Sequence, residues 1–511
     1  MRQDFAITTD VLVIGGGMAG AWAAIDARRA GASVVLVEKG WLGTSGVTAT
    51  AGPGHWWVPP ADRPAAIARR LAQSGGLNDP TWMERILETT WQSLPTLADV
   101  YDFPRNEQGQ PQYRAMRGPE YMRALRRRLE GIGVTIIDHA PARELLRHSD
   151  GSIGGARGIC RPQGDTWQVE AGAVVLATGG TAFRSHLLGS RNNTGDGYLM
   201  AAEVGAQLSG MEFTAVYCVA PARTTMTRSM SFAFAIYYDE TGQVLPISGP
   251  DITRPLAQAL MQGRVFADLG RTPADIRAQV PTISPNFMLP FRRWNIDPYA
   301  AKFEVTLHGE GTVRGIGGLR VEGPDCASGV PGLFVAGDAA TRELVAGAIS
   351  GGGNINSAWA LSSGRWAGAG AARFALRSQR RGGARGAGRA GLHPAGRRRI
   401  DEGAILARVQ DAMLSYDKVL FRHEAQMRAS LTGLNEAWRE LAEADRPARE
   451  LAALVASARW SLRAALLRNE SRGIHQRVDR PATDPAWARR ISVHGLDRLR
   501  AFPEPIARTG S

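Results

Sequence analysis

The sequence predicts an α/β protein built on a doubly wound parallel sheet. A strand, a glycine-rich turn, a helix and a second strand near its start support that prediction. Residues 10–14 (DVLVI) form a short apolar run typical of a buried parallel strand. A glycine-rich turn at 15–20 (GGGMAG) and a helical run at 21–28 follow it. A second apolar strand, residues 33–37, ends at Glu38. Strands alternating with helices build a parallel sheet that helices cover.

The glycine turn fits the G-x-G-x-x-G pattern of dinucleotide-binding proteins, followed at the expected distance by an acidic residue. We expect Gly15 to permit the tight turn, Gly17 to let the backbone approach a pyrophosphate, and Gly20 to let helix and strand pack closely. The helix beginning near Met18 directs unpaired N–H groups at the phosphates. Glu38 can accept hydrogen bonds from the ribose hydroxyls of an adenosine.

Two later strand ends favour FAD over a nicotinamide cofactor. Residues 173–180 (AVVLATGG) form a buried strand that breaks into small residues, where another part of the chain must pass close. Residues 332–338 (GLFVAGD) repeat this design and place Asp338 at a strand end, where it suits the polyol chain that a flavin has and NAD lacks. Three glycine-rich strand ends spread over more than 300 residues are best explained by one extended cofactor.

Three further motifs resemble the flavoprotein subunits of succinate dehydrogenase and fumarate reductase, with their relatives L-aspartate oxidase and adenylylsulfate reductase. They are residues 193–206 (NTGDGYLMAAEVGA), 351–356 (GGGNIN) and 468–481 (RNESRGIHQRVDRP). The resemblance covers roughly residues 8–372 and 401–490. It implies an FAD-dependent oxidoreductase in which hydride passes between a substrate carbon and the flavin.

The motifs and the resemblance together assign a set of cofactor-binding residues. The set is Gly15, Gly17, Met18, Ala19, Gly20, Glu38, Lys39, Thr44, Ser45, Thr178, Gly179, Asp196, Gly337, Asp338, Asn354, Ile355 and Asn356. We expect the FAD to be bound non-covalently. Membrane-bound relatives attach the flavin through a histidine, and residues 44–49 (TSGVTA) have Gly46 at that position.

The resemblance also divides the chain into domains. Residues 1–208 and 305–372 are expected to form the FAD-binding domain, and residues 209–304 the inserted α+β capping domain that closes over the flavin. The Arg- and Gly-rich residues 373–400 are expected to form a flexible linker. Residues 401–511 are expected to form a C-terminal helical domain, since helical periodicity runs through residues 401–470.

Composition excludes several other classes of protein. The chain has 511 residues, 44% of them hydrophobic and 21% charged, and no run of 18 apolar residues that would span a membrane. Its three cysteines lie far apart, so we expect no metal site, no iron–sulfur cluster within the chain, and a cytoplasmic location. Eight arginines at 377–399 account for much of the net charge of +13 without interleaved aromatic residues, so nucleic-acid binding is not expected.

Positions that hold C4 dicarboxylates in the family have changed here. Tyr217 and Val313 stand where the family has histidines, and Ser350 stands where it has an arginine. Only Arg254, which opens a cap helix, matches the family's proton-transferring arginine. We therefore expect a small, anionic substrate other than succinate, fumarate or aspartate, with Arg254 and Tyr217 as the catalytic pair. Alternatively, Arg254 is a surface cation and Tyr217 an aromatic filler.

Ser350 and other arginines are weaker candidates for substrate binding. Arg314 and the pair Arg292–Arg293 could contact an anion, although such residues are more often solvated. Arg472 lies near the active-site mouth in the family, which leaves a substrate role open. Glu470, Arg472, His475, Arg477 and Asp479 are expected to form a buried polar network that docks the helical domain.

The sequence is also compatible with two other functions. One is an adenylylsulfate reductase-like enzyme that reduces a sulfur anion together with an iron–sulfur partner. The other is a flavin-binding, non-catalytic subunit whose pocket has decayed, which Tyr217, Val313 and Ser350 would explain. The resemblance also allows an electron-transfer partner or iron–sulfur subunit for the main interpretation.

Overall fold

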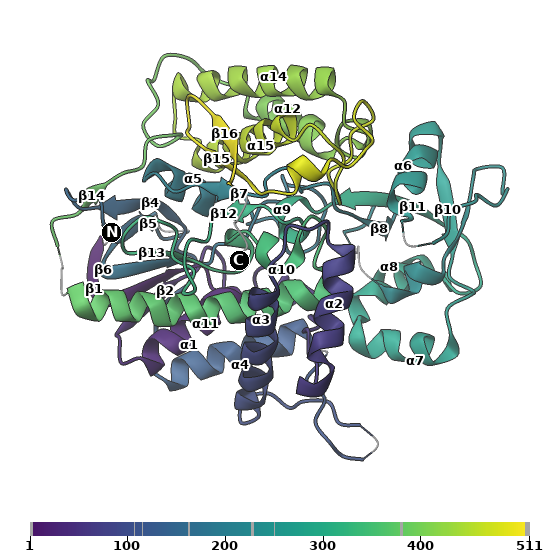
Figure 1. Ribbon diagram of the computed structural model, residues 1–511, viewed down its shortest axis with the longest axis horizontal. Coiled ribbons are helices and arrows are strands. Elements are labelled where there is room, and N and C mark those ends of the chain that lie inside the picture. The colour runs from purple at the N-terminus through teal and green to yellow at the C-terminus, as the bar shows by residue number, and fades with distance from the viewer. Residues whose placement is uncertain are drawn as a thin grey trace.

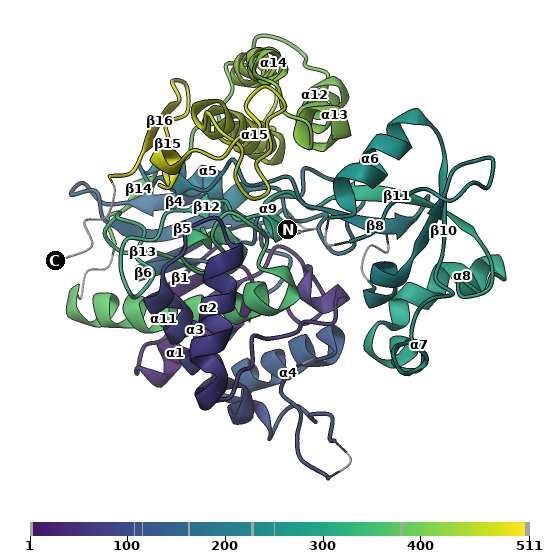
Figure 2. The ribbon, with the colours of Figure 1, turned by 45° about the vertical axis from the view of Figure 1, so that its right-hand side comes forward.

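The computed structural model describes residues 4–106, 108–114, 116–161, 164–225, 229–249, 251–378 and 382–505. A central sheet with its helices forms the body of the molecule in Figure 1, and the C-terminal helices lie above it. A separate lobe projects from one side of the body, as Figure 2 shows. Among the described residues, none of the helices combines the length and the apolar character that a membrane span requires.

The central sheet confirms the predicted α/β class. Its strand order is β14 (Arg385–Gly386), β4 (Ala142–Arg147), β5 (Ile153–Ile159), β6 (Thr166–Leu176), β1 (Phe5–Ile14), β2 (Val34–Val37) and β3 (Thr135–Ile137), while β13 (Leu333–Val335) also pairs with β6. Strand β1 runs parallel to β2 and β6. Because these parallel strands are buried on both faces, they read as continuous apolar runs in the sequence.

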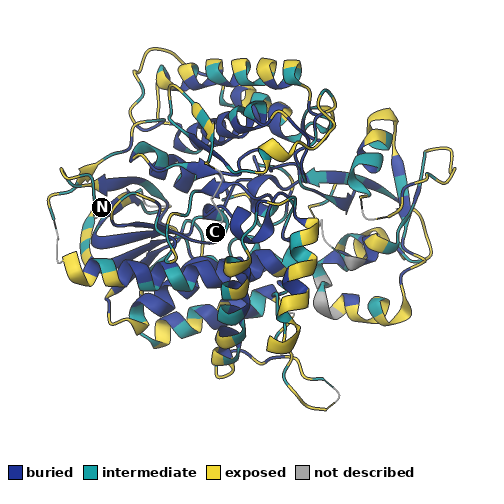
Figure 3. Cartoon of the chain, viewed as in Figure 1, coloured by how far each residue is buried: buried dark blue, intermediate teal, exposed yellow. Residues whose placement is uncertain are grey.

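Helices pack closely against the sheet and against one another. Helix α1 (Met18–Arg29) lies against the long α11 (Gly352–Ser378), and α4 (Gly118–Gly131) packs beside α1. A Cβ at Gly364 or Gly368 of α11 would lie 2.4 Å from Ala19 O or 2.0 Å from Ala23 O, so the glycines set this close approach. Helices α2 (Arg63–Gln73), α3 (Pro80–Ser93), α5 (Asp196–Glu203) and α10 (Glu343–Ala346) complete the body. Figure 3 shows the sheet mostly buried and exposed residues on outer helix turns.

The projecting lobe is formed by the segment that the sequence assigns to the cap. Its antiparallel sheet has the order β8 (Tyr217–Pro221), β11 (Phe303–Gly309), β10 (Val265–Asp268) and β9 (Ile236–Tyr238). Helices α6 (Thr253–Gln262), α7 (Ala274–Ile283) and α8 (Leu289–Trp294) surround an aromatic core, to which Val419 and Leu420 of the C-terminal region also contribute. The expected boundary at residue 304 falls inside β11, whose pairing with β8 and β10 carries the cap to Gly309.

The C-terminal region differs from the expected helical domain. Helices α12 (Glu402–Leu414), α13 (Tyr416–Val419), α14 (Glu424–Ala442) and α15 (Arg449–Leu467) are present. However, β15 (Ile491–His494) and β16 (Arg500–Pro503) form a hairpin that joins a second sheet with β7 (Leu208–Ser209) and β12 (Gly318–Leu319). The region is therefore mixed, because its last strands pair with segments distant in the sequence.

The expectation of a flexible linker at 373–400 is corrected. Helix α11 continues to Ser378, six residues past the expected boundary at 372, and β14 adds an edge strand to the central sheet. Gly388 N donates to Glu144 (3.0 Å), while the N–H groups of Arg389 and Ala390 donate to Glu203 (2.8 and 2.9 Å). Buried carboxylates thus fix a segment whose composition suggested flexibility. Residues 379–381 lie outside the described chain.

Candidate functional site

One cavity of about 680 Å³ runs from the glycine turn after β1 to the cap. It lies at the carboxyl ends of the parallel strands, where α/β proteins bind ligands. Thirteen of the seventeen expected cofactor residues line it: Gly15, Gly17, Met18, Ala19, Glu38, Lys39, Ser45, Thr178, Gly179, Asp196, Gly337, Asp338 and Asn356. The fold thus brings together segments that lie far apart in the sequence.

The glycines of the turn differ in what they face. Gly15 has a φ of +107°, and its Cβ would lie 2.4 Å from Ala177 O, so this position requires glycine. A Cβ at Gly20 would lie 1.8 Å from Gly15 O, which explains the close helix–strand packing and places Gly20 outside the cavity lining. Gly17 has an ordinary φ of −69°, and a Cβ there would meet no atom within 4 Å. Gly17 alone among the three keeps space open for a ligand.

Charged residues at the end of β2 organise the next part of the wall. Glu38 accepts hydrogen bonds from Gly16 N (2.6 Å), Gly40 N (2.7 Å) and Ser45 Oγ (2.9 Å). Lys39 Nζ lies 2.7 Å from Asp196 and 3.0 Å from Glu450 of α15. These contacts fix both side chains, and carboxylate lone pairs of Glu38 remain for ribose hydroxyls.

Unpaired buried atoms test whether this wall fits FAD. Thr178 Oγ1, Asp196 Oδ1 and both amide atoms of Asn356 are buried without a protein hydrogen-bond partner, and all three residues line the cavity. Buried polar groups are normally paired, so these atoms are suited to a ligand rich in hydroxyl and phosphate groups. Together with the space at Gly17, they fit a dinucleotide that extends from the glycine turn toward the cap.

Three other expected cofactor residues lie outside the lining. Thr44 is exposed and its hydroxyl lies near Trp41 O (3.5 Å). Asn354 is exposed at the start of α11, and Ile355 is buried in the core. Along a helix, adjacent residues point in different directions, so the GGGNIN motif presents Gly353 and Asn356 to the cavity, but not Asn354 or Ile355.

Sequence reasoning missed other parts of the wall. The segment from Val47 to Pro53, residues 117–119 and residues 192–194 contribute to it. The structure explains the glycine at Gly118, because a Cβ there would lie 2.0 Å from Thr48 O. The cap adds residues without any motif: Cys218, Val219, Ser229, Phe232, Ala233, Ile252, Thr253, Ser284, Asn286 and Phe287.

Tyr217 lines the cavity, but its hydroxyl is directed elsewhere. It donates to Leu414 O at 3.0 Å, and burial raises the pKa of Tyr217 above its usual value. A tyrosine is a poor acid or base when its pKa is raised and its hydroxyl proton is donated to a backbone carbonyl. This geometry gives no support to the expected proton-transfer role, and it places Tyr217 between the cap and the C-terminal helices.

Arg254 also departs from the expectation. It is not among the residues that line the cavity, although its neighbours Ile252 and Thr253 are. Its guanidinium lies over the ring of Phe421, 5.0 Å from the centroid. The first turn of α6 therefore turns Arg254 toward the segment after α13. Arg292 and Arg293 are exposed on α8 and lie outside the site.

Arg314, at the end of the short helix α9 (Gly311–Arg314), is the expected substrate residue that does face the cavity. Its Nε is buried without a hydrogen-bond partner and lies 3.8 Å from the carboxylate of the buried Glu310. The thiol of Cys218 donates to the other oxygen of Glu310. Burial lowers the pKa of Arg314, although guanidinium stays protonated in proteins.

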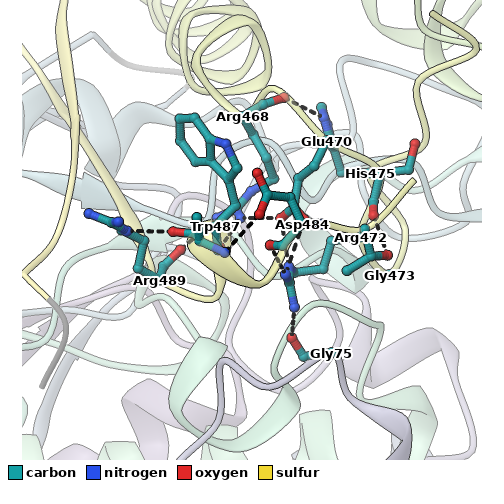
Figure 4. Close-up of polar contacts among 12 residues, drawn as sticks. Gly75, Arg468, Glu470, Arg472, Gly473, His475, Asp484, Trp487 and Arg489 are labelled. Carbon is teal, nitrogen blue, oxygen red and sulfur yellow. Dashed lines mark hydrogen bonds and ion pairs between the residues drawn. The ribbon is translucent and has the colours of Figure 1, made fainter. Parts of the chain in front are cut away.

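Ser350 and Arg472, the remaining substrate candidates, do not line the cavity. Arg70 of α2 donates to the carbonyls of Ala346, Ile349 and Ser350 (2.9, 3.3 and 3.2 Å) and so fixes the loop that carries Ser350. Arg472 donates to Gly75 O (2.5 Å), Glu470 and Asp484 O, as Figure 4 shows. These contacts give Arg472 a docking role between the C-terminal region and the body.

The expected polar network in the C-terminal motif is present and centres on Arg468. This side chain is fully buried and donates to Glu212 (2.8 Å), Glu470 (3.0 Å), Trp487 O (2.9 Å) and Arg489 O (2.9 Å), as Figure 4 shows in part. The network joins the segment before β8 to the C-terminal residues. Each charge in it has a partner, as burial requires.

Glu343, the first residue of α10, makes stability near this network depend on pH. Burial, reinforced by the nearby Glu212 carboxylate, raises the pKa of Glu343 to about 8. The folded protein therefore holds a proton there that the unfolded chain releases above its ordinary pKa, so stability falls as pH rises toward 8.

Glu343→Gln should remove this dependence. We expect the free energy of unfolding to fall less between pH 5 and pH 8 in the variant, by up to about 1.4 kcal/mol per pH unit. Chemical denaturation across this pH range measures the effect, with the exposed Glu436→Gln as control. Identical pH profiles for Glu343→Gln and the unmodified protein would contradict it.

Comparison with known proteins agrees with this site. Residues 10–182 match the family model described as FAD dependent oxidoreductase, and residues 407–498 match Fumarate reductase flavoprotein C-term. One subunit of the fumarate reductase (CoM/CoB) of Methanothermobacter marburgensis is 26% identical, with 95% of this chain and 97% of the relative covered. L-aspartate oxidase of Mycobacterium tuberculosis is 27% identical, with 96% of each covered.

Solved structures share the fold. The FrdA chain of E. coli quinol fumarate reductase superposes with a TM-score of 0.81 at 18% identity, covering 100% of this chain and 98% of that one. The cavity, the lining residues that suit FAD and the matches to both family models lead to one conclusion. The chain belongs to the FAD-dependent oxidoreductases of the fumarate reductase and succinate dehydrogenase flavoprotein family.

Proposed function

We propose that this flavoprotein transfers hydride between non-covalently bound FAD and a small anionic substrate other than succinate, fumarate or aspartate. The continuity of one cavity from the glycine turn to the cap carries the proposal. When bound, FAD supplies the hydride acceptor or donor. The chain holds the cofactor along Gly17, Glu38 and Asp338, while cap residues exclude water and Arg314 offers a cation to the substrate.

The residues at the family's substrate positions support a changed specificity. Tyr217 donates to a backbone carbonyl, Val313 has no polar group, and Ser350 lies outside the cavity lining. Where relatives hold a dicarboxylate with two histidines and an arginine, this chain offers none of the three. Charge-assisted hydrogen bonds contribute about 1.5–3 kcal/mol each, so their joint loss costs several orders of magnitude in affinity or rate.

A substrate panel tests this proposal on FAD-loaded protein. Flavin reduced anaerobically by light should not be reoxidised by fumarate, and oxidised flavin should not be reduced by succinate or aspartate, at rates typical of the family. Another small organic anion should do one or the other. Rapid turnover of succinate or fumarate would refute the specificity, and a flavin that no anion oxidises or reduces would refute the function.

Non-covalent attachment predicts complete release of the flavin on acid precipitation. Gly46 lies on the cavity wall where the covalent linkage of some relatives would need an imidazole. All yellow colour should appear in the supernatant, measured by flavin absorbance. Colour retained in a washed, denatured pellet would show a covalent bond to another side chain.

We also propose an electron-transfer partner. The methanogen relative is named as one subunit of its fumarate reductase, which implies that it works in an assembly. Reduced flavin in this chain would pass its electrons to such a partner subunit or to a soluble acceptor.

A further inference from the structure

The end of the cavity beneath the cap is mainly apolar. Phe232 and Phe287 are 6% and 2% exposed, and their rings meet edge to face with centroids 5.6 Å apart. Phe287 packs in turn on Phe291 of the cap core at 5.2 Å. Such rings have little freedom to move, so they form a fixed wall against which an apolar or aromatic group can pack.

Positive charge at this end is limited to one place. Arg314 is the only cationic side chain among the described lining residues of the cap and α9. The other lining cations bind carboxylates of the body: Lys39 lies 2.7 Å from Asp196, and Arg117 lies 3.1 Å from Glu120. Polar lining residues of the cap, such as Thr253 and Asn286, are neutral.

The surroundings of Arg314 suit one anionic group and disfavour a second. Its buried Nε has no hydrogen-bond partner, and its planar guanidinium can bind a carboxylate through two parallel bonds. Glu310, 3.8 Å away, partly balances the positive charge. A second carboxylate would therefore enter a region without a free cation, where burial of an unpaired charge is costly.

We propose that the substrate is a monocarboxylate with an apolar or aromatic body. Arg314 binds its carboxylate, and Phe232 and Phe287 contact its body. This inference rests on the proposed function and narrows it, since a dicarboxylate would need a second cation that these lining residues do not provide. Arg314 is thus the residue that determines charge specificity.

Binding to FAD-loaded protein tests the inference without turnover. Cinnamate, its neutral amide cinnamamide, and the dianion fumarate are each titrated while the perturbation of the flavin spectrum is recorded. We expect cinnamate to bind at least about tenfold more tightly than either of the others, the factor that one charge-assisted pair supplies. Equal or tighter binding of fumarate would overturn the inference and leave the proposed hydride transfer intact.

Variants test whether Arg314 causes the preference for cinnamate. Arg314→Gln should weaken cinnamate binding about tenfold or more and leave cinnamamide binding nearly unchanged. Phe287→Ala should weaken both ligands to a similar extent. The exposed Arg293→Gln, on α8 and outside the lining of this cavity, is the matched control and should change neither. Equal loss of cinnamate and cinnamamide binding in Arg314→Gln would overturn the assignment.

FAD occupancy is measured for every variant. If Arg314→Gln loses its flavin, Arg314 contacts the cofactor and the assignment to substrate is wrong. The comparison of cinnamate with fumarate on the unmodified protein still decides the substrate class in that case. A failure of every anion to perturb, oxidise or reduce the flavin would instead refute the proposed function itself.

Discussion

Gly17→Val should yield a folded protein that does not retain FAD. Backbone strain is not the reason, because φ at Gly17 is −69° and the added side chain would meet no protein atom within 4 Å at Cβ. The valine would instead fill the space in which the backbone approaches the pyrophosphate. Loss of two charge-assisted hydrogen bonds there would weaken FAD binding about a hundredfold or more.

Flavin absorbance relative to protein absorbance measures this loss after purification, and circular dichroism checks the fold. Gly131→Val is the matched control: Gly131 ends α4, is exposed, and its Cβ would also meet no atom within 4 Å. The control should keep its flavin. Full FAD occupancy in Gly17→Val would show that the pyrophosphate does not lie at this turn.

Arg468→Met should destabilise the whole chain strongly. Arg468 is fully buried between Glu212 and Glu470, and its removal would leave both carboxylates without this partner. Breaking a buried ion pair by removing one member costs about 3–5 kcal/mol. We therefore expect a large shift of the denaturation midpoint or a failure to accumulate folded protein.

Chemical denaturation monitored by tryptophan fluorescence measures this effect. The exposed Arg480→Met, in the same C-terminal motif, is the control and should change stability by less than about 0.5 kcal/mol. The double variant Arg468→Met with Glu212→Gln should recover part of the loss, because one unpaired charge is then absent. A single variant as stable as the control would show that the network contributes no stability.

The parts of the site that the sequence predicts are those built from backbone. The glycine turn and the strand ends at Glu38 and Asp338 depend on local residue types, and the fold places them on one cavity wall. Within the GGGNIN motif, the side-chain directions of Asn354 and Ile355 escaped prediction, because helix phase decides them.

The cap end of the site could not be predicted from the sequence in the same way. Its lining residues carry no motif, and the two residues chosen by alignment, Tyr217 and Arg254, make their contacts elsewhere. The acceptor for Tyr217, Leu414 O, lies 197 residues further along the chain. Residue type alone does not reveal such a partner.

The sequence by itself determined the α/β class, the cofactor and the C-terminal polar motif, because each rests on short segments whose chemistry is local. The tertiary structure alone decided where the cap ends, that β15 and β16 extend the second sheet, and that residues 382–400 are held rather than free. It also decided that Arg314, rather than Arg254, lines the cavity. Side-chain direction, burial and charge balance arise from contacts between distant segments, and these exist only once the chain has folded.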